Sequence, residues 1–462
     1  MSLPTLPSRD PIPVEKAFLG WDPADRYRRC WSKPEDSVGI VGPPRYGKTS
    51  GLIIPTVLTW NGPLVSTSTR GDILDFSYAR RNAIAGHAGK VYVYDPFRSE
   101  PAWRSMNWSP MDGCEVPDLC YRRVATLTAV SANGVENGDY WRAGAAGILR
   151  AYFHAAALER LPFTMVRKWI ARQEIREPAA ILRMSDSSGR IWSDDLEGMA
   201  LIGDRERGSF YSVARNALEA TAQPTVLESC RASDLDVDRF LATKSSLFII
   251  GPSHHQQAVA PLVVGLIDSI AQRAAEVAAP MPRGRLAPPL LLALDEVANI
   301  APIPSLPALV SEGGGRGIVT MWSVQSLAQL RVRYGAEEQS AILTATTAKI
   351  IFGGMSNGED LQNVSMWAGE VQETQSSFQT GAQRAEAGLP DARPQGGTAG
   401  SNAAEASRSI SRLYRPALPI EALQMMPPAY AWLFYRSNPP LQVYTPPAYT
   451  IPELAALQAP RR

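Results

Sequence analysis

The chain has 462 residues, of which 45% are hydrophobic and 20% charged, and its formal net charge is +1. A chain of this size can bury a full core, and we expect two domains or one large domain with an insertion. The balanced charge excludes a global positive field that would attract DNA. Any contact with nucleic acid must therefore come from a local patch or from the interior of a ring.

The N-terminal segment lacks the basic and apolar regions of a signal peptide, and we find no apolar run near the ~20 residues that a membrane helix needs. We therefore expect a chain that does not span a membrane. The cysteines and histidines show no C-x-x-C, H-E-x-x-H or zinc-finger spacing, which argues against a structural metal or a disulfide framework and makes a reducing cytoplasm the default. These residues are Cys30, Cys114, Cys120, Cys230, His87, His154, His254 and His255.

The first motif is a phosphate-binding loop. An apolar strand at 37–41 leads into a G-x-x-x-x-G-K-T sequence and then into a helix start. Lys48 can reach the β- and γ-phosphates of a nucleotide, and the Thr49 hydroxyl can ligate Mg²⁺ at the positive end of the helix dipole. The candidate nucleotide-binding residues are Gly42, Pro43, Pro44, Arg45, Tyr46, Gly47, Lys48, Thr49 and Ser50.

Two prolines in this loop restrict how it can bind phosphate. Pro43 and Pro44 have no N–H, so the cradle must be built mainly from the amides of residues 45–50. We expect the side chains of Arg45 and Tyr46 to line its rim.

Two further apolar runs of strand length follow the loop, at 63–67 and 90–94. The pattern then becomes helical between about 118 and 235, where segments such as 140–153 are alanine-rich and amphipathic. We expect an all-α insertion at 118–235, between a first part of the nucleotide-binding domain at 1–117 and a second part at 236–371.

Buried-type strands return after the insertion and are separated mostly by segments of helical length. This alternation predicts an α/β fold with a mostly parallel sheet and helices on both faces. The later runs of strand type lie at 246–250, 289–294, 318–323, 348–353 and 431–435.

The run at 289–294 ends in two carboxylates, Asp295 and Glu296. In open α/β sheets, the carboxyl ends of the strands form the crevice that binds ligands. We assign Asp295 to holding Mg²⁺ and Glu296 to orienting or deprotonating the attacking water. With the phosphate loop, these residues predict a nucleotide hydrolase.

Residues 372–411 are rich in Gln, Ser, Gly, Ala and Thr, and large apolar side chains are almost absent. Such a segment does not offset the entropy of ordering, so we expect a flexible loop there. Residues 412–462 should complete the nucleotide-binding domain with one strand. The proline-rich tail after 437 is expected to lie extended over the surface.

Four elements recur in order after the acidic strand end: D-E-x-A-N at 295–299, I-P-x-L at 303–306, an Arg-Gly turn at 316–317 and Q-S-x-A-Q-L at 325–330. Together with the phosphate loop they resemble the type IV coupling proteins of the TraG/TraD kind, ATPases that feed DNA into conjugative secretion channels. The resemblance covers about residues 36–370 and, more weakly, 412–450.

The resemblance implies a RecA-like ATPase domain with a smaller all-α domain, assembled as a hexameric ring that couples ATP hydrolysis with Mg²⁺ to DNA translocation. The implied partners are single-stranded or double-stranded DNA, relaxase or relaxosome proteins, and type IV secretion channel components at the membrane. The implied location is the cytoplasm, docked at the inner face of the cell membrane. Many members begin with transmembrane helices, so we expect a soluble variant or an anchor on another chain.

The resemblance also completes the expected catalytic set of Lys48, Glu296, Gln325 and Arg316. It makes Gln325 the polar group that senses the γ-phosphate, and Gln can bridge the attacking water and the phosphate oxygens. Arg316 stands in a glycine-dense turn at 313–317, where a mobile backbone can present the guanidinium to the nucleotide of the next subunit.

The alternatives to this hypothesis are a protein-secreting motor, a non-translocating adaptor and a small P-loop enzyme such as a GTPase or a kinase. A motor that secretes proteins would share the same catalytic residues. A non-translocating adaptor usually loses the loop lysine or the acidic residues, whereas Lys48, Asp295 and Glu296 are all present. A small GTPase is disfavoured because no N-K-x-D sequence follows the strands, and a D-E strand end favours water over a kinase substrate as the nucleophile.

Overall fold

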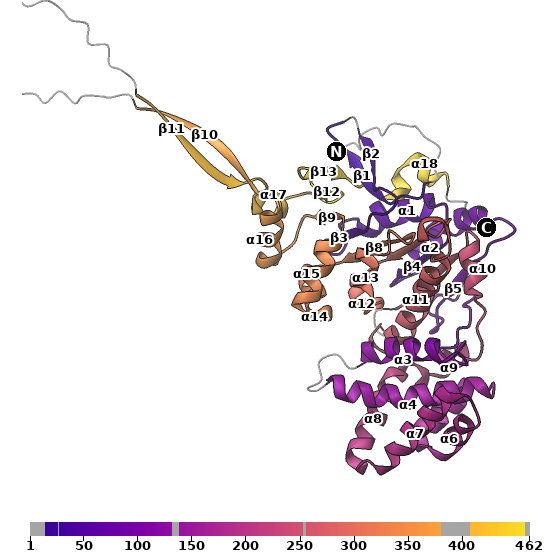
Figure 1. Ribbon diagram of the computed structural model, residues 1–462. Coiled ribbons are helices and arrows are strands. Elements are labelled where there is room, and N and C mark those ends of the chain that lie inside the picture. The colour runs from indigo at the N-terminus through magenta and orange to yellow at the C-terminus, as the bar shows by residue number, and fades with distance from the viewer. Residues whose placement is uncertain (1–13, 26, 132–137, 253–255, 380–406, 458–462) are drawn as a thin grey trace, which may run out of the picture. The chain divides into compact units, whose positions relative to one another are not determined.

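A computed structural model describes residues 14–25, 27–131, 138–252, 256–379 and 407–457 (Figure 1). These residues form two compact units, one within residues 1–355 and 425–462 and the other within residues 356–424. The first unit contains the large sheet and most of the helices. The second contains a two-stranded sheet and two helices.

Eleven strands form one sheet in the order β2-β1-β13-β12-β9-β3-β8-β7-β4-β6-β5. The seven strands from β9 to β5 in that order pair in parallel, which confirms the prediction of a mostly parallel sheet. Their bounds are β3 Val38–Val41, β4 Leu64–Ser68, β5 Val91–Tyr94, β6 Ser246–Ile250, β7 Leu290–Leu294, β8 Ile318–Val324 and β9 Ala348–Phe352.

Four antiparallel strands extend the sheet beyond β9. The predicted strand at 431–435 is β12, Tyr430–Tyr435, and it pairs with both β9 and β13, Leu441–Tyr444. The expectation that the chain after 437 only covers the surface was wrong for β13, because β13 lies inside the sheet between β12 and β1. The sequence pattern also missed β1, Phe18–Asp22, and β2, Arg28–Trp31.

Both faces of the parallel sheet are buried. Ile40, Leu291 and Ile350 belong to one core cluster with residues of two helices, α1, Ile54–Thr59, and α2, Asp72–Ala85. The strand residues that alternate with them are buried too, as expected for a sheet covered by helices on both sides. This double burial explains why the runs were readable as strands.

Every described element between β5 and β6 is helical, as predicted for 118–235. Figure 1 shows α4, α6, α7 and α8 gathered at the end of the first unit away from β1 and β2, and α4 packs against α3, α6, α7 and α8. These helices belong to the same compact unit as the sheet, so the insertion is a helical subregion of that unit. The bounds are α3 Pro117–Ser131, α4 Gly138–Leu158, α5 Phe163–Arg172, α6 Arg176–Arg183, α7 Ser187–Gly198, α8 Asp204–Ala217, α9 Pro224–Ser229 and α10 Val237–Ala242.

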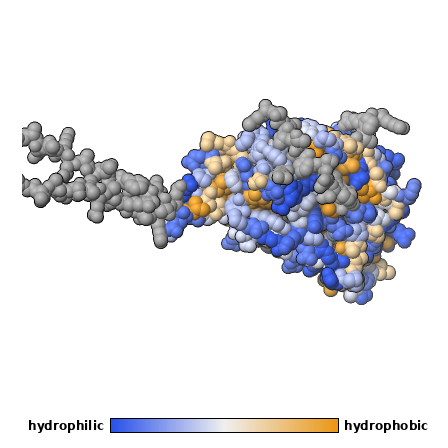
Figure 2. Space-filling view, turned by 90° about the horizontal axis from the view of Figure 1, so that it is seen from above, coloured by the Kyte–Doolittle hydropathy of each residue, from blue (hydrophilic) through white to orange (hydrophobic). Residues whose placement is uncertain are grey.

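The helix after β6, α11, spans Gln256–Ala278 and has a mean hydropathy of 1.3 over its most apolar window. Our expectation that no segment has the length and apolarity of a membrane helix was wrong for α11. However, 72% of that window is buried, and α11 packs on α3 and β8, which is typical of a core helix. On the face seen in Figure 2, hydrophobic residues occur in small groups among hydrophilic ones.

The second unit corrects the prediction of a flexible loop at 372–411 for the two ends of that segment. β10, Glu370–Gln379, and β11, Ser407–Pro416, pair antiparallel in continuous register from Glu370↔Pro416 to Gln379↔Ser407. Main-chain hydrogen bonds form this ladder, and they do not require the large apolar side chains whose absence suggested disorder. Residues 380–406 of the predicted loop lie outside the described residues. The unit also contains α16, Gly358–Trp367, and α17, Ile420–Gln424.

Candidate nucleotide-binding site

The phosphate loop connects β3 to a helix that starts with a π-helical turn at Thr49–Ile53 and continues as α1. The Gly42 N–H donates to the Val324 carbonyl of β8 at 3.2 Å, and a Cβ on Gly42 would lie 2.5 Å from the Phe352 Cβ. Arg45 and Gly47 have φ angles of 69° and 103°, so the backbone reverses curvature twice. Such alternation turns successive amides toward one point and forms an anion-binding concavity.

The Lys48 side chain is buried inside this loop. Its Nζ donates to the carbonyl oxygens of Gly42 at 2.6 Å and Pro43 at 3.0 Å. Burial lowers the pKa of Lys48, and the nearby carboxylates of Asp295 and Glu296 oppose that shift. The ammonium group is thus largely out of water, where an anionic ligand interacts with it strongly.

Asp295 is held by two hydroxyl groups. Thr49 Oγ1 donates to Oδ2 at 2.6 Å, and Ser323 Oγ donates to Oδ1 at 2.5 Å. The parallel register of β7 and β8 pairs Leu294 with Trp322, so the next residue of each strand brings Asp295 beside Ser323. Burial raises the pKa of Asp295, and the two hydroxyl donors partly oppose it.

Glu296 has both carboxylate oxygens engaged. Gln325 Nε2 donates to Oε1 at 3.1 Å, and Asn299 Nδ2 approaches Oε2 at 3.5 Å. The Glu296 backbone is left-handed, with φ 50° and ψ 48°, and its N–H donates to Ser323 Oγ at 3.1 Å. A non-glycine residue in this region is strained by about 1 kcal/mol or more, so the surrounding bonds hold Glu296 in place.

The residues following the loop pack against the C-terminal part of the chain. A Cβ on Gly51 would lie 2.3 Å from the carbonyl oxygen of Thr445, directly after β13. The Ala429 N–H donates to the Tyr46 carbonyl at 3.4 Å, and the Thr445 N–H donates to the Ala429 carbonyl at 2.7 Å. Residues 429–445 therefore pack against the backbone of the phosphate loop and of the helix that follows it.

The structure brings Lys48, Thr49, Asp295, Glu296 and Gln325 together at the carboxyl edge of neighbouring strands. In the binding loop, Pro44 and Arg45 are exposed, and Pro43, Gly47 and Ser50 are partly buried. The half-buried Tyr46 ring lies against Gly354, where an added Cβ would overlap the Tyr46 hydroxyl.

Arg316 does not join this group. It precedes β8, whereas Gln325 directly follows β8, so Arg316 lies at the opposite edge of the sheet. Seven strand residues separate those edges by about 23 Å at ~3.3 Å per residue. Arg316 forms an exposed ion pair with Glu312 at 3.4 Å. It is too far to act on the site of its own chain.

Three side chains at the site were not predicted. Ser323 links Asp295 to the backbone of Glu296, Asn299 approaches the Glu296 carboxylate, and Thr67 Oγ1 donates to the Asp295 carbonyl at 3.0 Å. The signal for Ser323 was a buried hydroxyl residue two positions before Gln325 in an otherwise mostly apolar strand. Asn299 lies within the D-E-x-A-N motif, but the motif alone gave it no role.

The donor set fits a nucleotide phosphate chain with Mg²⁺. Magnesium is usually held by one or two carboxylates together with substrate phosphates and waters. Thr49 and Asp295 supply a hydroxyl and a carboxylate 2.6 Å apart at the helix start, next to the amide concavity and Lys48. In the part of the chain that the structure describes, no group of three or more His, Cys, Asp or Glu residues is placed to hold a metal ion by itself.

Relatives with curated functions include conjugal transfer proteins. The chain is 25% identical over 369 residues to a probable conjugal transfer protein TraG of Sinorhizobium fredii, covering 75% of this chain and 55% of the relative. It is 23% identical over 356 residues to the conjugal transfer protein TraG of Escherichia coli, covering 69% and 53%. The chain thus spans about half the length of the curated relatives it matches.

Solved structures support the same fold. The bacterial conjugative coupling protein TrwBdeltaN70 in its unbound form superposes with a TM-score of 0.60 and 17% identity, covering 89% of this chain and 85% of that chain. TrwB in complex with ADP and Mg²⁺ gives the same score, identity and coverage. At this identity the likeness shows the fold alone, a RecA-like ATPase fold with a large mostly parallel sheet.

The sequence model of the family described as "Type IV secretory system Conjugative DNA transfer" matches residues 18–459, nearly the whole chain. This match covers both the phosphate loop and the acidic strand end whose geometry is described above. The chain therefore belongs to the type IV secretory system conjugative DNA transfer family, that of the type IV coupling proteins.

Proposed function

We propose that this chain is an ATP-hydrolysing motor that couples relaxosome-bound DNA to a type IV secretion channel and translocates the DNA. The observation that carries the proposal is the meeting of Lys48, the Thr49–Asp295 pair and the Glu296–Gln325 pair at one sheet edge. Family membership supports DNA as the transported molecule.

ATP would bind through its β- and γ-phosphates to Lys48 and to the amides of residues 45–50. These groups offer positive charge and N–H donors in a concave loop. Thr49 and Asp295 would hold Mg²⁺, which neutralises phosphate charge when bound. TrwB has been crystallised with an ATP analogue and with ADP and Mg²⁺, which supports the same ligands here.

Hydrolysis requires a base for the attacking water. Glu296 accepts the water proton as the oxygen–phosphorus bond forms and the bond from the γ-phosphorus to the β–γ bridging oxygen breaks, releasing ADP and phosphate. Gln325 lies within hydrogen-bond distance of Glu296 and orients the water against the γ-phosphate. An amide donor on a Glu296 oxygen competes with the attacking water for that oxygen and stabilises the negative charge that must accept the proton.

Arg316 would act in a ring. Because it lies at the edge opposite the phosphate loop of its own chain, it can stabilise a transferring phosphoryl group only in a neighbouring subunit. This role requires a head-to-tail ring in which this edge of one subunit faces the nucleotide edge of the next. We propose a homo-hexamer on this basis and on the family resemblance.

The proposed setting is the cytoplasm, at the inner face of the membrane. There the motor would receive single-stranded or double-stranded DNA with relaxase or relaxosome proteins and pass it to the channel. Phosphate contacts in a central pore are largely independent of sequence, so we expect little sequence preference.

Phosphate release with and without DNA tests the proposal. We expect Mg²⁺-dependent ATP hydrolysis that DNA stimulates, and a loss of roughly 100-fold or more in Glu296→Gln with ATP still bound, since general base catalysis contributes at least that much. The exposed Glu337→Gln serves as a matched control with the wild-type rate. Hydrolysis without any response to DNA would favour a protein-secreting motor, and no hydrolysis would favour an adaptor.

A further inference from the structure

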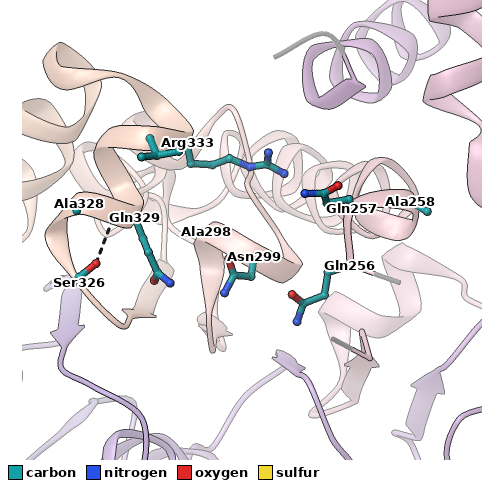
Figure 3. A pocket seen from close by; sticks show the side chains of 10 residues that line it. Gln256, Gln257, Ala258, Ala298, Asn299, Ser326, Ala328, Gln329 and Arg333 are labelled. Atoms are coloured by element: carbon teal, nitrogen blue, oxygen red, sulfur yellow. Dashed lines mark hydrogen bonds between the residues drawn. The ribbon is translucent and has the colours of Figure 1, made fainter. Parts of the chain in front are cut away.

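A cavity of about 680 Å³ opens beside the candidate catalytic site, between α11, the short helix α12, Val297–Ile300, and α14, Leu327–Tyr334 (Figure 3). Six polar residues line it, and the four other lining residues are alanine or valine. The polar residues are Gln256, Gln257, Asn299, Ser326, Gln329 and Arg333.

The chemistry of this lining favours a ligand that is anionic and rich in hydrogen-bonding edges. Four amides supply both donors and acceptors, Arg333 supplies one positive charge, and none of the described lining residues is a carboxylate. The Arg333 Nε is buried without a hydrogen-bond partner among the described residues. In Figure 3 the Arg333 side chain extends from α14 across the cavity.

A single-stranded nucleic acid has these properties. Guanidinium groups pair with phosphate, and Asn or Gln amides pair with base edges. The volume suits a nucleotide-sized ligand, whereas a duplex is too wide to enter. A basic peptide segment is disfavoured, because the lining offers Arg333 and no opposing carboxylate.

Two lining residues also reach the candidate catalytic groups. Asn299 approaches the Glu296 carboxylate at 3.5 Å, and Gln329 Oε1 accepts from the Gln325 N–H at 2.9 Å. Figure 3 shows the side chains of Gln329, Asn299 and Gln256 directed to the same side of the cavity. A ligand that draws on the Asn299 amide therefore competes directly with Glu296 for it.

We propose that this cavity binds one or two nucleotides of a single DNA strand, and that this occupant withdraws the Asn299 amide from Glu296 and so frees the base for hydrolysis. The inference rests on the proposed ATPase function and names the site through which DNA acts on it. Without DNA, Glu296 stays engaged by two amides and hydrolysis is slow. With DNA in the cavity, the carboxylate oxygen Oε2 loses the competing Asn299 donor and accepts the water proton more readily.

The first experiment measures binding. Fluorescence anisotropy with a short labelled single-stranded oligodeoxynucleotide should show an affinity roughly tenfold lower for Arg333→Gln, the loss expected for one hydrogen bond to a charged group. Arg331→Gln, on the same helix but outside the lining, is the matched control and should bind as the wild type does. Equal affinity in wild type, Arg333→Gln and Gln257→Ala overturns the site, as does preferential binding of a peptide or a duplex.

The second experiment measures ATP hydrolysis with and without the same oligonucleotide. Asn299→Ala should raise the DNA-independent rate roughly two- to tenfold, the equivalent of one hydrogen bond, and should reduce the stimulation by DNA. A purely structural role for Asn299 would lower the rate instead, and that result overturns the release of Glu296. Asn216→Ala, exposed on α8, is the control for the substitution itself.

Different results would refute the cavity inference and the proposed motor function. If the wild type hydrolyses ATP and responds to DNA but the cavity variants behave as the wild type, the cavity inference is wrong and the motor function stands. If the wild type neither hydrolyses ATP nor binds the oligonucleotide, the motor function itself fails.

Discussion

Ser323 tests how the site is held together, because its hydroxyl serves two residues at once. It donates to Asp295 Oδ1 at 2.5 Å and accepts from the backbone N–H of Glu296 at 3.1 Å. Ser323→Ala removes both bonds and little volume. The buried Asp295 carboxylate then keeps only the Thr49 hydroxyl donor described above, and the strained backbone of Glu296 loses the acceptor for its N–H.

The size of the effect follows from these two losses. A hydrogen bond to a charged group contributes about 1.5–3 kcal/mol, and one pKa unit corresponds to 1.36 kcal/mol. Burial already raises the pKa of Asp295 and the Ser323 bond lowers it, so the variant should raise that pKa further. Because Mg²⁺ binds the ionised carboxylate, the acid limb of the rate profile should move to higher pH.

Steady-state phosphate release, measured across pH and Mg²⁺ concentration, would show this shift together with a rate reduced by roughly tenfold or more at neutral pH. Thr320→Val is the matched control, since the Thr320 hydroxyl is buried on the same strand without a hydrogen-bond partner among the described residues. It should leave the profile unchanged. A Ser323→Ala enzyme with the wild-type acid limb and Mg²⁺ dependence would refute the reasoning.

Three further predictions concern the ring, the charge at the metal-binding position and the packing behind the loop. Arg316→Ala and Glu296→Gln, each nearly inactive alone, should regain activity when the two variants are mixed. In randomly mixed rings, about a quarter of the interfaces combine an intact Glu296 on one subunit with an intact Arg316 on its neighbour. A mixture no faster than its components contradicts an Arg316 that acts on the neighbouring subunit. Asp295→Asn should abolish hydrolysis and yet raise the melting temperature of the nucleotide-free protein at neutral pH. The pKa of Asp295 is raised in the folded state, so its ionisation destabilises the fold at any pH above its unfolded-state pKa of about 3.9. The gain in melting temperature should therefore vanish below that pH. Gly51→Ala should destabilise the protein by about 1–3 kcal/mol in denaturant unfolding, because the new Cβ would meet the Thr445 carbonyl, whereas Gly198→Ala, with open space around its Cβ position, should not.

The sequence predicted the parallel core well because double burial leaves a plain signal. The ends of each strand from β3 to β9 differ by at most one residue from those of the predicted apolar run. The motifs that follow β3, β7 and β8 share one edge of the sheet because these strands are parallel, as expected. The phosphate loop and the acidic strand end were readable as motifs. Their assembly beside Gln325 follows from adjacent parallel strands.

What escaped prediction depends on pairing and register. β1, β2 and β13 are short strands of four or five residues, and their place beside β12 comes from antiparallel pairing that no local pattern encodes. The β10–β11 hairpin is polar, so its composition suggested a loop. Ser323 can bond Asp295 only because the register of β7 and β8 places the two residues side by side. A single hydroxyl residue in a strand does not indicate which residue it will bond.

Because residues 429–445 pack against the phosphate loop, the loop is synthesised long before the residues that support it. A ribosome releases the chain from the N-terminus, so Lys48 and Thr49 emerge long before the strands that support them. The backbone against which Gly51 packs arrives only with Thr445, much later in the chain. A nascent chain thus carries the complete phosphate-loop motif before residues 429–445 are present to pack against it. We therefore expect the phosphate loop to bind nucleotide firmly only after Thr445 has been made and packed against it.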